Sequence, residues 1–191
     1  MTETPLSGYR VQVIVTNYGV EQDELVVPVE RLRERGATVV VAASSTDPVQ
    51  TLVGDKDPGR VVRPDTTFGD AGSDFDLLLI PGGTVNADSL RLESGAVDTV
   101  RAFASSGRPI AAICHGPWAL VEAGVVDGRT LTSYPSLQTD LRNAGATWVD
   151  QAVSVDDEGG FTLVTSRNPG DLDEFVPAVE EALAASHERV R

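Results

Sequence analysis

Cys114 and His115 are the adjacent residues of this chain whose types most favour chemistry. A thiol with an imidazole nearby is the smallest pair that supports nucleophilic catalysis by a thiolate. Cys114 is the only cysteine among 191 residues, and His115 is one of two histidines. A lone cysteine is also commonly a small buried hydrophobic residue. Composition alone favours that structural role, whereas the sequence around the pair favours the catalytic one.

The sequence on both sides of Cys114 predicts a sharp turn from a strand into a helix. The apolar run 110–113 is typical of a short buried strand. Gly116 and Pro117 then open an apolar helical segment, and proline suits the first turn of a helix. The residues two positions before and after the cysteine, Ala112 and Gly116, are small. Small neighbours fit the crowded geometry of a nucleophile elbow.

This placement carries three expectations. A helix N-terminus favours negative charge, so we expect the pKa of the Cys114 thiol to be lowered. The free N–H groups at the start of that helix are expected to hold a developing oxyanion. Because the backbone turns between them, the side chains of Cys114 and His115 are expected to approach each other.

The composition excludes several classes of protein. Acidic residues outnumber basic ones by 29 to 15, for a net charge of −14. Such a charge opposes binding to nucleic acid or to an anionic membrane. No apolar run is long enough to span a bilayer, and the first five residues do not resemble a signal peptide. One cysteine and no Cys/His cluster argue for a reducing cytoplasm and against a metal site. We expect no cofactor.

Strand and helix patterns alternate along the chain. Apolar β-rich runs are predicted as strands, and amphipathic segments between them as helices; the principal strands are expected near 9–16, 38–43, 75–81, 110–113 and 161–165, and the longer helices near 21–35, 94–106, 135–144 and 171–187. This alternation predicts a three-layer α/β sandwich with a mostly parallel, flavodoxin-like sheet and helices on both faces. The length favours one domain over residues 1–191, with a core at about 10–185.

Ligands of open α/β sheets bind beyond the carboxyl ends of the strands. Three predicted loops meet there, namely 17–24, 81–88 and the turn at Cys114. They bring Glu21, two glycines able to present N–H groups (Gly82 and Gly83), and Asp88, which could orient a histidine. Taken singly, Glu21 is better explained as an acid favoured at a helix N-terminus, and Asp88 as a helix cap. Their common position at one edge of the sheet favours the functional interpretation.

The sequence resembles the PfpI endopeptidase family, within the class I glutamine-amidotransferase-like superfamily that includes the parkinsonism-associated deglycase. The resemblance covers roughly residues 10–183. Its most specific parts are the segments 79–83, 111–117, 132–135 and 143–150, with 20–25 similar to the first loop of the family.

The resemblance implies roles for individual residues. Cys114 would be the nucleophile and His115 its base. Glu21 would match a buried acid whose protonated carboxyl hydrogen-bonds the sulfur, which requires a raised pKa. The third triad member would be an acid supplied by a neighbouring subunit. Asp88 occupies that region after a one-residue insertion, and Glu93 is the alternative.

The resemblance also implies the surroundings of the reaction. Gly83 and the backbone N–H of His115 would be oxyanion donors, with Gly82 beside them. Trp118 and Tyr134 are assigned to the substrate pocket, where Trp118 replaces a polar residue of the compared relative. A homodimer or higher oligomer with the site near the interface is expected, because the acid would come from another chain.

Two functions of different classes follow. The first is a cofactor-free cysteine hydrolase that acts on a peptide bond or on a glyoxal-derived adduct, or performs a glyoxalase-type reaction. The second is a non-enzymatic stress protein, a redox sensor or chaperone-like dimer that uses an oxidisable Cys114. A glutamine amidotransferase is disfavoured because its triad histidine lies downstream, and His187 comes too late in the chain.

Overall fold

Short runs of valine, leucine and isoleucine form the central sheet of the computed structural model, which describes residues 5–186. The sheet has seven strands in the order β11-β12-β8-β7-β1-β3-β6. Its bounds are β1 Arg10–Ile14, β3 Thr38–Ala43, β6 Thr66–Thr67, β7 Leu77–Ile80, β8 Ile110–Ile113, β11 Val153–Asp156 and β12 Leu163–Ser166. All neighbouring pairs are parallel except β11 with β12.

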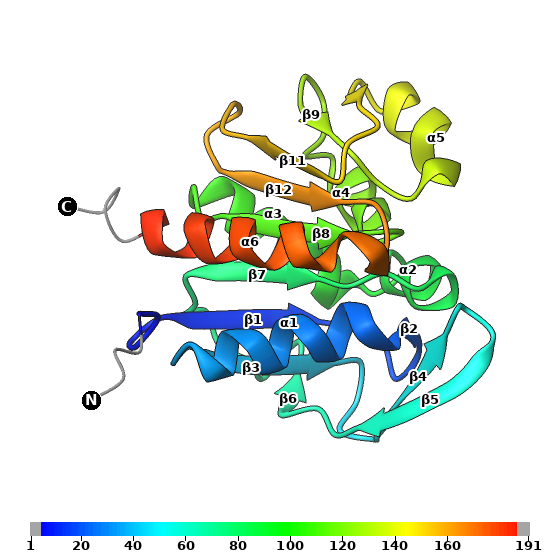
Figure 1. The fold of residues 1–191 in the computed structure, drawn as a ribbon, viewed down its shortest axis with the longest axis vertical. Helices are drawn as coiled ribbons and strands as arrows, with labels where there is room; N and C mark the ends of the chain where they lie inside the picture. The colour runs from blue at the N-terminus through cyan, green and yellow to red at the C-terminus, as the bar shows by residue number, and fades with distance from the viewer. Residues whose placement is uncertain (1–4, 187–191) are drawn as a thin grey trace.

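The five inner parallel strands follow the flavodoxin order. Numbered along the chain, β1, β3, β7, β8 and β12 lie in the order 5-4-3-1-2 across the sheet, which places a switch point between β1 and β7. Their carboxyl ends point to the same edge, on the right in Figure 1. The predicted mostly parallel sheet is confirmed.

Helices cover both faces of the sheet. The helices α1 (Gln22–Glu34) and α6 (Leu172–Ser186) lie in front of it in Figure 1, and α3 (Ser94–Ser105) and α4 (Pro117–Ala123) lie behind. Successive residues of β7 alternate between the two layers, since Leu77 and Leu79 pack with the first pair of helices, while the intervening side chains pack with the second. The three-layer arrangement predicted from the alternation is confirmed.

Smaller elements surround the carboxyl edge of the sheet. Beside it lies a second sheet with the order β2-β4-β5, built from β2 Tyr18–Glu21, β4 Val49–Val53 and β5 Asp57–Val62. The remaining elements are α2 Thr84–Leu90, β9 Thr130–Leu131, α5 Gln138–Asn143, β10 Thr147–Trp148 and two 3₁₀ turns, Pro135–Leu137 and Pro169–Asp171. Residues 18–20 were expected in a loop but form a strand, because β2 pairs with β4.

A buried ion pair joins β9 to the antiparallel edge of the sheet. Arg129 and Asp156 expose 3% and 5% of their side chains, and the Arg129 Nε donates to Asp156 Oδ1 at 2.9 Å. The guanidinium also donates to the carbonyls of Asp156 and Phe161. Burial alone would raise the pKa of Asp156, but the backbone N–H groups of Thr130 and Glu158, together with Arg129, hold it below its usual value.

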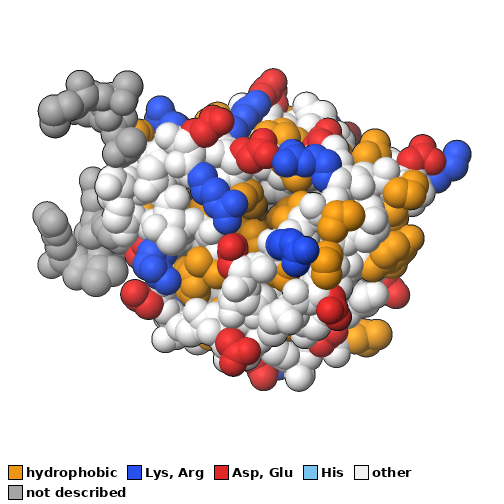
Figure 2. Space-filling view, turned by 90° about the horizontal axis from the view of Figure 1, so that it is seen from below, with side chains coloured by type: hydrophobic (Ala, Val, Ile, Leu, Met, Phe, Trp, Pro, Cys, Tyr) orange, Lys and Arg blue, Asp and Glu red, His pale blue; other side chains and the backbone are white. Residues whose placement is uncertain are grey.

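The surface mixes both signs of charge. On the face seen in Figure 2, basic and acidic side chains alternate around small exposed hydrophobic areas. Among residues 5–186, no helix is both long and apolar enough to cross a membrane.

Candidate active site

Cys114 lies where the chain leaves the central strand β8, three residues before α4 begins at Pro117. Its backbone has φ 62°, a left-handed conformation that is uncommon outside glycine. The turn leaves no room at Gly116, where a Cβ would lie 2.5 Å from the Ile80 carbonyl oxygen. The predicted sharp strand-to-helix turn therefore exists, with the sulfur at the carboxyl edge of the sheet.

The Cys114 and His115 side chains meet, as the turn geometry predicts. Cys114 Sγ lies 3.2 Å from His115 Nδ1. The imidazole is buried, with its ring stacked on Tyr134 at 4.7 Å between centroids and its edge against Trp118. Trp118 is fixed in turn by a hydrogen bond from its Nε1 to Asp140. The two aromatic residues therefore hold the imidazole in place beside the sulfur.

The carboxyl that faces the sulfur belongs to Glu24, in the first turn of α1. Its side chain is fully buried, and Glu24 Oε2 accepts a hydrogen bond from the Gly82 N–H at 2.8 Å. Burial raises the pKa of Glu24 to about 8, although hydrogen bonding with Cys114 and Gly82 partly offsets the rise. At neutral pH this carboxyl is mostly protonated, which is the state expected of an acid beside a nucleophilic sulfur.

The assignment of Glu21 to that position is corrected. Glu21 is the last residue of β2, and its carboxylate accepts hydrogen bonds from the backbone N–H groups of Gly54 and Asp55, at 3.1 and 3.0 Å. It therefore holds the turn between β4 and β5. Glu24 lies three residues further along, within α1, and its carboxyl rather than that of Glu21 takes the position expected beside the sulfur.

The pKa of the Cys114 thiol is raised, which contradicts the lowered value expected from the helix N-terminus. Burial is the main cause. The charge of Glu24, which that carboxyl gains above its own pKa of about 8, is the next, and the N–H groups of Gly83 and His115 act in the opposite direction. Cys114 exposes only 4% of its surface. The sulfur therefore rests as a thiol, and a base must remove its proton when it reacts.

The two glycines after β7 have different roles. The Gly82 N–H donates to Glu24, so of the two glycines expected to present N–H groups at the site, Gly82 has its N–H already bound. A Cβ at Gly82 would lie 2.7 Å from the Cys114 Cβ, and its absence permits the close packing. The N–H groups of Gly83 and His115 are directed at the sulfur instead. Their role as oxyanion donors stays a prediction.

The outer nitrogen of the imidazole faces two hydroxyl groups. His115 Nε2 lies 3.4 Å from Thr84 Oγ1 and 3.2 Å from Ser136 Oγ. Thr84 donates from Oγ1 to Asp55 Oδ2 at 2.7 Å and from its backbone N–H to Asp55 Oδ1 at 2.8 Å. Thr84, Ser136 and Asp55 were not predicted from the sequence. The only available signal was a Gly-Asp turn between two short strands, which is common in proteins.

The acids expected to complete the triad lie elsewhere. Asp88 is exposed on α2, and Glu93 precedes the first turn of α3. Neither has a hydrogen bond or ion pair with His115 among the described residues. Their supply to the site of a second chain stays a prediction. His187 lies outside the described residues.

A cavity of about 180 Å³ opens above the sulfur, lined by Glu21, Glu24, Gly54, Asp55, Cys114, Tyr134 and Pro169. Its lining contains three carboxyl groups and neither lysine nor arginine. Within residues 5–186, no group of three or more His, Cys, Asp or Glu side chains is placed to hold a metal ion.

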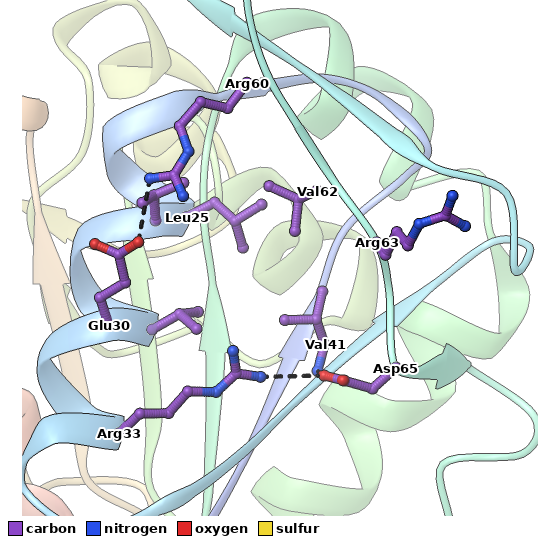
Figure 3. A pocket seen from close by; sticks show the side chains of 10 residues that line it. Leu25, Glu30, Arg33, Val41, Arg60, Val62, Arg63 and Asp65 are labelled. Atoms are coloured by element: carbon purple, nitrogen blue, oxygen red, sulfur yellow. Dashed lines mark hydrogen bonds and ion pairs between the residues drawn. The ribbon is translucent and has the colours of Figure 1, made fainter.

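A different cavity, of about 130 Å³, lies between α1 and the strands β3 and β5. Its floor is apolar, and the side chains at its rim are paired, Arg60 with Glu30 and Arg33 with Asp65 (Figure 3). The guanidinium of Arg63 points away from both pairs in Figure 3. With no nucleophile and its facing charges paired, this cavity is not the candidate site.

Comparison with known proteins agrees with the fold and the sequence pattern. The family model described as the DJ-1/PfpI family matches residues 9–182. A protein named Deglycase PfpI from Pyrococcus furiosus is 40% identical over 153 residues, which cover 80% of this chain and 86% of that protein. Protein/nucleic acid deglycase 2 of Escherichia coli is 36% identical over 166 residues, which cover 87% of this chain and 92% of that protein.

A solved structure supports the same relationship. The crystal structure of DJ-1beta from Drosophila melanogaster is 34% identical and superimposes with a TM-score of 0.81, covering 92% of this chain and 90% of that one. The match of the family model over most of the chain, the curated relatives and the shared architecture lead to one conclusion. The chain belongs to the DJ-1/PfpI family.

Proposed function

We propose that this protein is a cofactor-free cysteine hydrolase that removes carbonyl adducts from proteins or peptides. The observation that carries the proposal is the 3.2 Å approach of Cys114 Sγ to His115 Nδ1, beneath a cavity and beside two directed backbone N–H groups. The deglycase names of relatives from Pyrococcus furiosus and Escherichia coli support the substrate class. Peptide-bond hydrolysis at the same site is the closely related alternative.

The geometry supports a defined sequence of proton movements. As Cys114 Sγ attacks the carbonyl carbon, its proton passes to His115 Nδ1. The negative charge that develops on the carbonyl oxygen is stabilised by the N–H groups of Gly83 and His115. In a methylglyoxal adduct the carbonyl attacked is that of the lactoyl amide, which the initial hemiaminal reaches by proton transfer alone, so the carbon under attack carries the amine. Collapse of the tetrahedral intermediate expels this amine, which takes the proton from His115, and water then hydrolyses the thioester to a carboxylic acid and the free Cys114 thiol. Neutral Glu24 adds no negative charge beside the sulfur during the attack.

The charge of the cavity lining restricts the class of substrate that can bind near Cys114. Of the three carboxyl groups that line the cavity, Glu24 is mostly neutral at pH 7, and the other two, Glu21 and Asp55, have no basic side chain in the lining to balance them. A substrate with a free carboxylate at this point would be repelled, whereas a neutral carbonyl or one attached to a basic side chain would be accepted. Adducts on lysine or arginine side chains meet this condition.

The test is turnover of methylglyoxal adducts of N-acetyllysine and N-acetylarginine, with a peptide library assayed in parallel. Cys114→Ser and His115→Ala are each expected to lower kcat/KM by at least about 10³-fold, because each removes a group on which bond formation depends. Ser105→Ala, on the exposed face of α3, is the matched control and is expected to retain full activity. Undiminished turnover by Cys114→Ser would overturn the hydrolase proposal.

A redox function for the same sulfur is the second proposal. A protonated Glu24 at the sulfur is well placed to donate a hydrogen bond to an oxidised Cys114, and a sole cysteine has no intramolecular partner for a disulfide. Mild peroxide is expected to add two oxygen atoms at Cys114, measured by intact-protein mass spectrometry. An unchanged mass after peroxide treatment would exclude this function.

Assembly into a homodimer or higher oligomer is also proposed. The exposed position of Asp88 on α2 supports it, since that carboxyl does not reach His115 of its own chain. Native mass spectrometry measures the number of subunits. If the site is shared, mixing Asp88→Ala and Cys114→Ala chains is expected to restore part of the activity, because one pairing combines both intact residues. No recovery in a mixed oligomer would contradict a shared site.

A further inference from the structure

His115 has to present a bare nitrogen to Cys114 if it is to act as a base. Neutral imidazole carries its proton on one nitrogen only, and the other nitrogen accepts. Nδ1 faces the sulfur, so only the form with its proton on Nε2 can take the thiol proton. In the other form, Nδ1 can donate but cannot accept. The groups around Nε2 therefore determine whether His115 can accept the proton of the Cys114 thiol.

The hydrogen bonds of the Thr84 hydroxyl favour the form of His115 that is protonated at Nε2. A threonine hydroxyl has one proton to donate. A carboxylate only accepts, so at Thr84 Oγ1 that proton is committed to Asp55 Oδ2, at 2.7 Å. Toward His115, Thr84 can then only accept. A bare Nε2 at 3.4 Å would set two lone pairs against each other, whereas an Nε2–H would donate to Thr84 Oγ1.

Ser136 does not compete with this arrangement. Its hydroxyl lies 3.2 Å from Nε2 and has no other hydrogen bond among the described residues, so it can either donate or accept. The Ser136 hydroxyl can therefore pair with either form of the imidazole, as a donor to an unprotonated Nε2 or as an acceptor from Nε2–H. The Thr84 hydroxyl can only accept from Nε2–H, because its one proton is donated to Asp55.

Asp55 is itself held in place by its own chain. Its two carboxylate oxygens accept from the Thr84 hydroxyl and from the Thr84 backbone N–H. Asp55 has φ 56°, and its N–H is bound by the carboxylate of Glu21, which also binds the Gly54 N–H. The turn between β4 and β5 is thereby fixed against α2. Glu21, expected at the sulfur, acts here at the far end of the same chain of contacts.

We propose that Asp55, acting through Thr84, holds His115 in the form protonated at Nε2 and is thereby a positioning residue of the site within a single chain. In the reaction, the Cys114 proton passes to Nδ1 and gives an imidazolium that keeps its Nε2–H on Thr84. The hydroxyl proton stays on Thr84 Oγ1 and continues to be donated to Asp55 Oδ2. The negative charge of Asp55 stabilises the imidazolium. The inference rests on the proposed hydrolase function, but its spectroscopic test does not require turnover.

The primary measurement is the ¹⁵N spectrum of the His115 ring, assigned with His187→Gln, since the chain has two histidines. The unsubstituted protein is expected to show Nε2–H. Asp55→Asn is expected to move the proton to Nδ1, because the amide oxygen would pair with the Thr84 N–H and its NH₂ would donate to the Thr84 hydroxyl. That hydroxyl is then free to donate to Nε2.

Thr84 variants test the relay separately. Thr84→Val removes the hydroxyl at nearly constant volume and is expected to let the Nδ1–H form appear, since Ser136 can then donate to Nε2. Thr84→Ser is expected to restore Nε2–H. Ser136→Ala is expected to keep Nε2–H, because Thr84 remains. If Thr84→Val does not fold, Asp55→Asn tests the same step.

The reactivity of Cys114 gives a second readout. Because it is the only cysteine, its alkylation by iodoacetamide at pH 7 reports the pair alone. Asp55→Asn and Thr84→Val are expected to slow it about tenfold, the range of one hydrogen bond. kcat for adduct turnover should fall by a similar factor in both variants. KM is expected to stay unchanged in Thr84→Val, since Thr84 does not line the cavity, whereas Asp55→Asn also alters the charge of the cavity lining. The matched controls are Asp57→Asn, in the same hairpin, and Thr46→Val, both exposed and both expected to be unaffected.

The outcomes separate the two proposals. Nδ1–H in the unsubstituted protein, or an unchanged proton position in both Asp55→Asn and Thr84→Val, would overturn the positioning role even if Cys114 proved essential for turnover. Conversely, Nε2–H that shifts as expected in a protein without turnover would support the positioning role and count against the hydrolase.

Discussion

Glu24, in the first turn of α1, and Asp156, at the end of β11, are both buried carboxyls, yet their surroundings give them opposite properties. Asp156 meets the guanidinium of Arg129 and two backbone N–H groups, which keep its pKa low despite burial. Glu24 has no cation among its hydrogen-bond or ion-pair partners in the described chain, and burial raises its pKa to about 8. Burial alone does not identify a functional acid, whereas burial without a counter-charge does.

The comparison also explains where each carboxyl lies. Asp156 joins β9 to β11 and lies away from the cavity at Cys114, so its ionic partner serves the architecture. Glu24 lines that cavity. An unpaired buried carboxyl is unfavourable for folding. The position of Glu24 beside a thiol indicates that this carboxyl serves the reaction at Cys114 rather than stability. Three substitutions test the contrast between a structural Asp156 and a functional Glu24.

The largest expected effect is at the ion pair. Asp156→Asn leaves the Arg129 guanidinium buried without its counter-charge, which typically costs about 3–5 kcal/mol. We expect the free energy of unfolding at pH 7 to fall by that amount, measured by urea denaturation. Asp98→Asn, in an exposed pair with Arg101, is the control and should change little. A loss below about 1 kcal/mol at Asp156 would remove its structural role.

The next effect is the pH dependence caused by Glu24. Its folded-state pKa, about 8, exceeds the ordinary 4.5, so the folded state binds the extra proton between these values. Its contribution to stability is therefore complete below pH 4.5 and is lost as the pH rises through 8. By the conversion of 1.36 kcal/mol per pKa unit, the loss between pH 5 and 7.5 is about 3 kcal/mol.

Glu24→Gln removes the titrating group and retains an acceptor for the Gly82 N–H. We expect this variant to lose the Glu24 part of the pH slope and to exceed the unsubstituted protein in stability at pH 8, as measured by urea titrations at several pH values. Identical slopes in the two proteins would show that Glu24 is already ionised at neutral pH. The contrast with Asp156 would then fail.

The smallest expected effect belongs to an exposed pair that lacks burial altogether. Arg31 and Asp173 are 2.7 Å apart but expose 42% and 83% of their side chains. Arg31→Ala is expected to cost less than about 1 kcal/mol and to cost nothing measurable in 1 M salt, because water and ions screen such pairs. A loss comparable to that at Asp156 would mean that burial is not the deciding factor.

The central strands and the turn at Cys114 followed from local sequence, because both depend on neighbouring residues. The run 110–113 has to be buried, and Gly116 with Pro117 allows only a sharp continuation. The mostly parallel sheet followed from the alternation of elements. The approach of His115 to the sulfur followed from adjacency across that turn.

The acids were harder to assign, since their roles depend on which side of α1 faces the sheet. Glu21 and Glu24 are three residues apart at the start of one helix, and both suit its N-terminus. Only the pairing of β2 with β4 shows that Glu21 still belongs to a strand and faces a hairpin. The thiol pKa was misjudged for a related reason, because burial of the sulfur is set by packing rather than by the helix alone.

Asp55 could not be found from sequence at all. It lies 29 residues before Thr84, in an exposed turn whose composition is ordinary. Its contact with α2 exists only because the β4–β5 hairpin lies beside the carboxyl edge of the main sheet (Figure 1). Such contacts across long stretches of chain leave no periodic pattern.

The left-handed backbone at Cys114 has a consequence for efforts to make this protein more heat-resistant. A non-glycine residue in that conformation carries about 1–2 kcal/mol of strain, which glycine would relieve. A laboratory selection that rewards only survival at high temperature would therefore favour Cys114→Gly and discard the sulfur. Directed evolution of this chain has to select for turnover and heat resistance together.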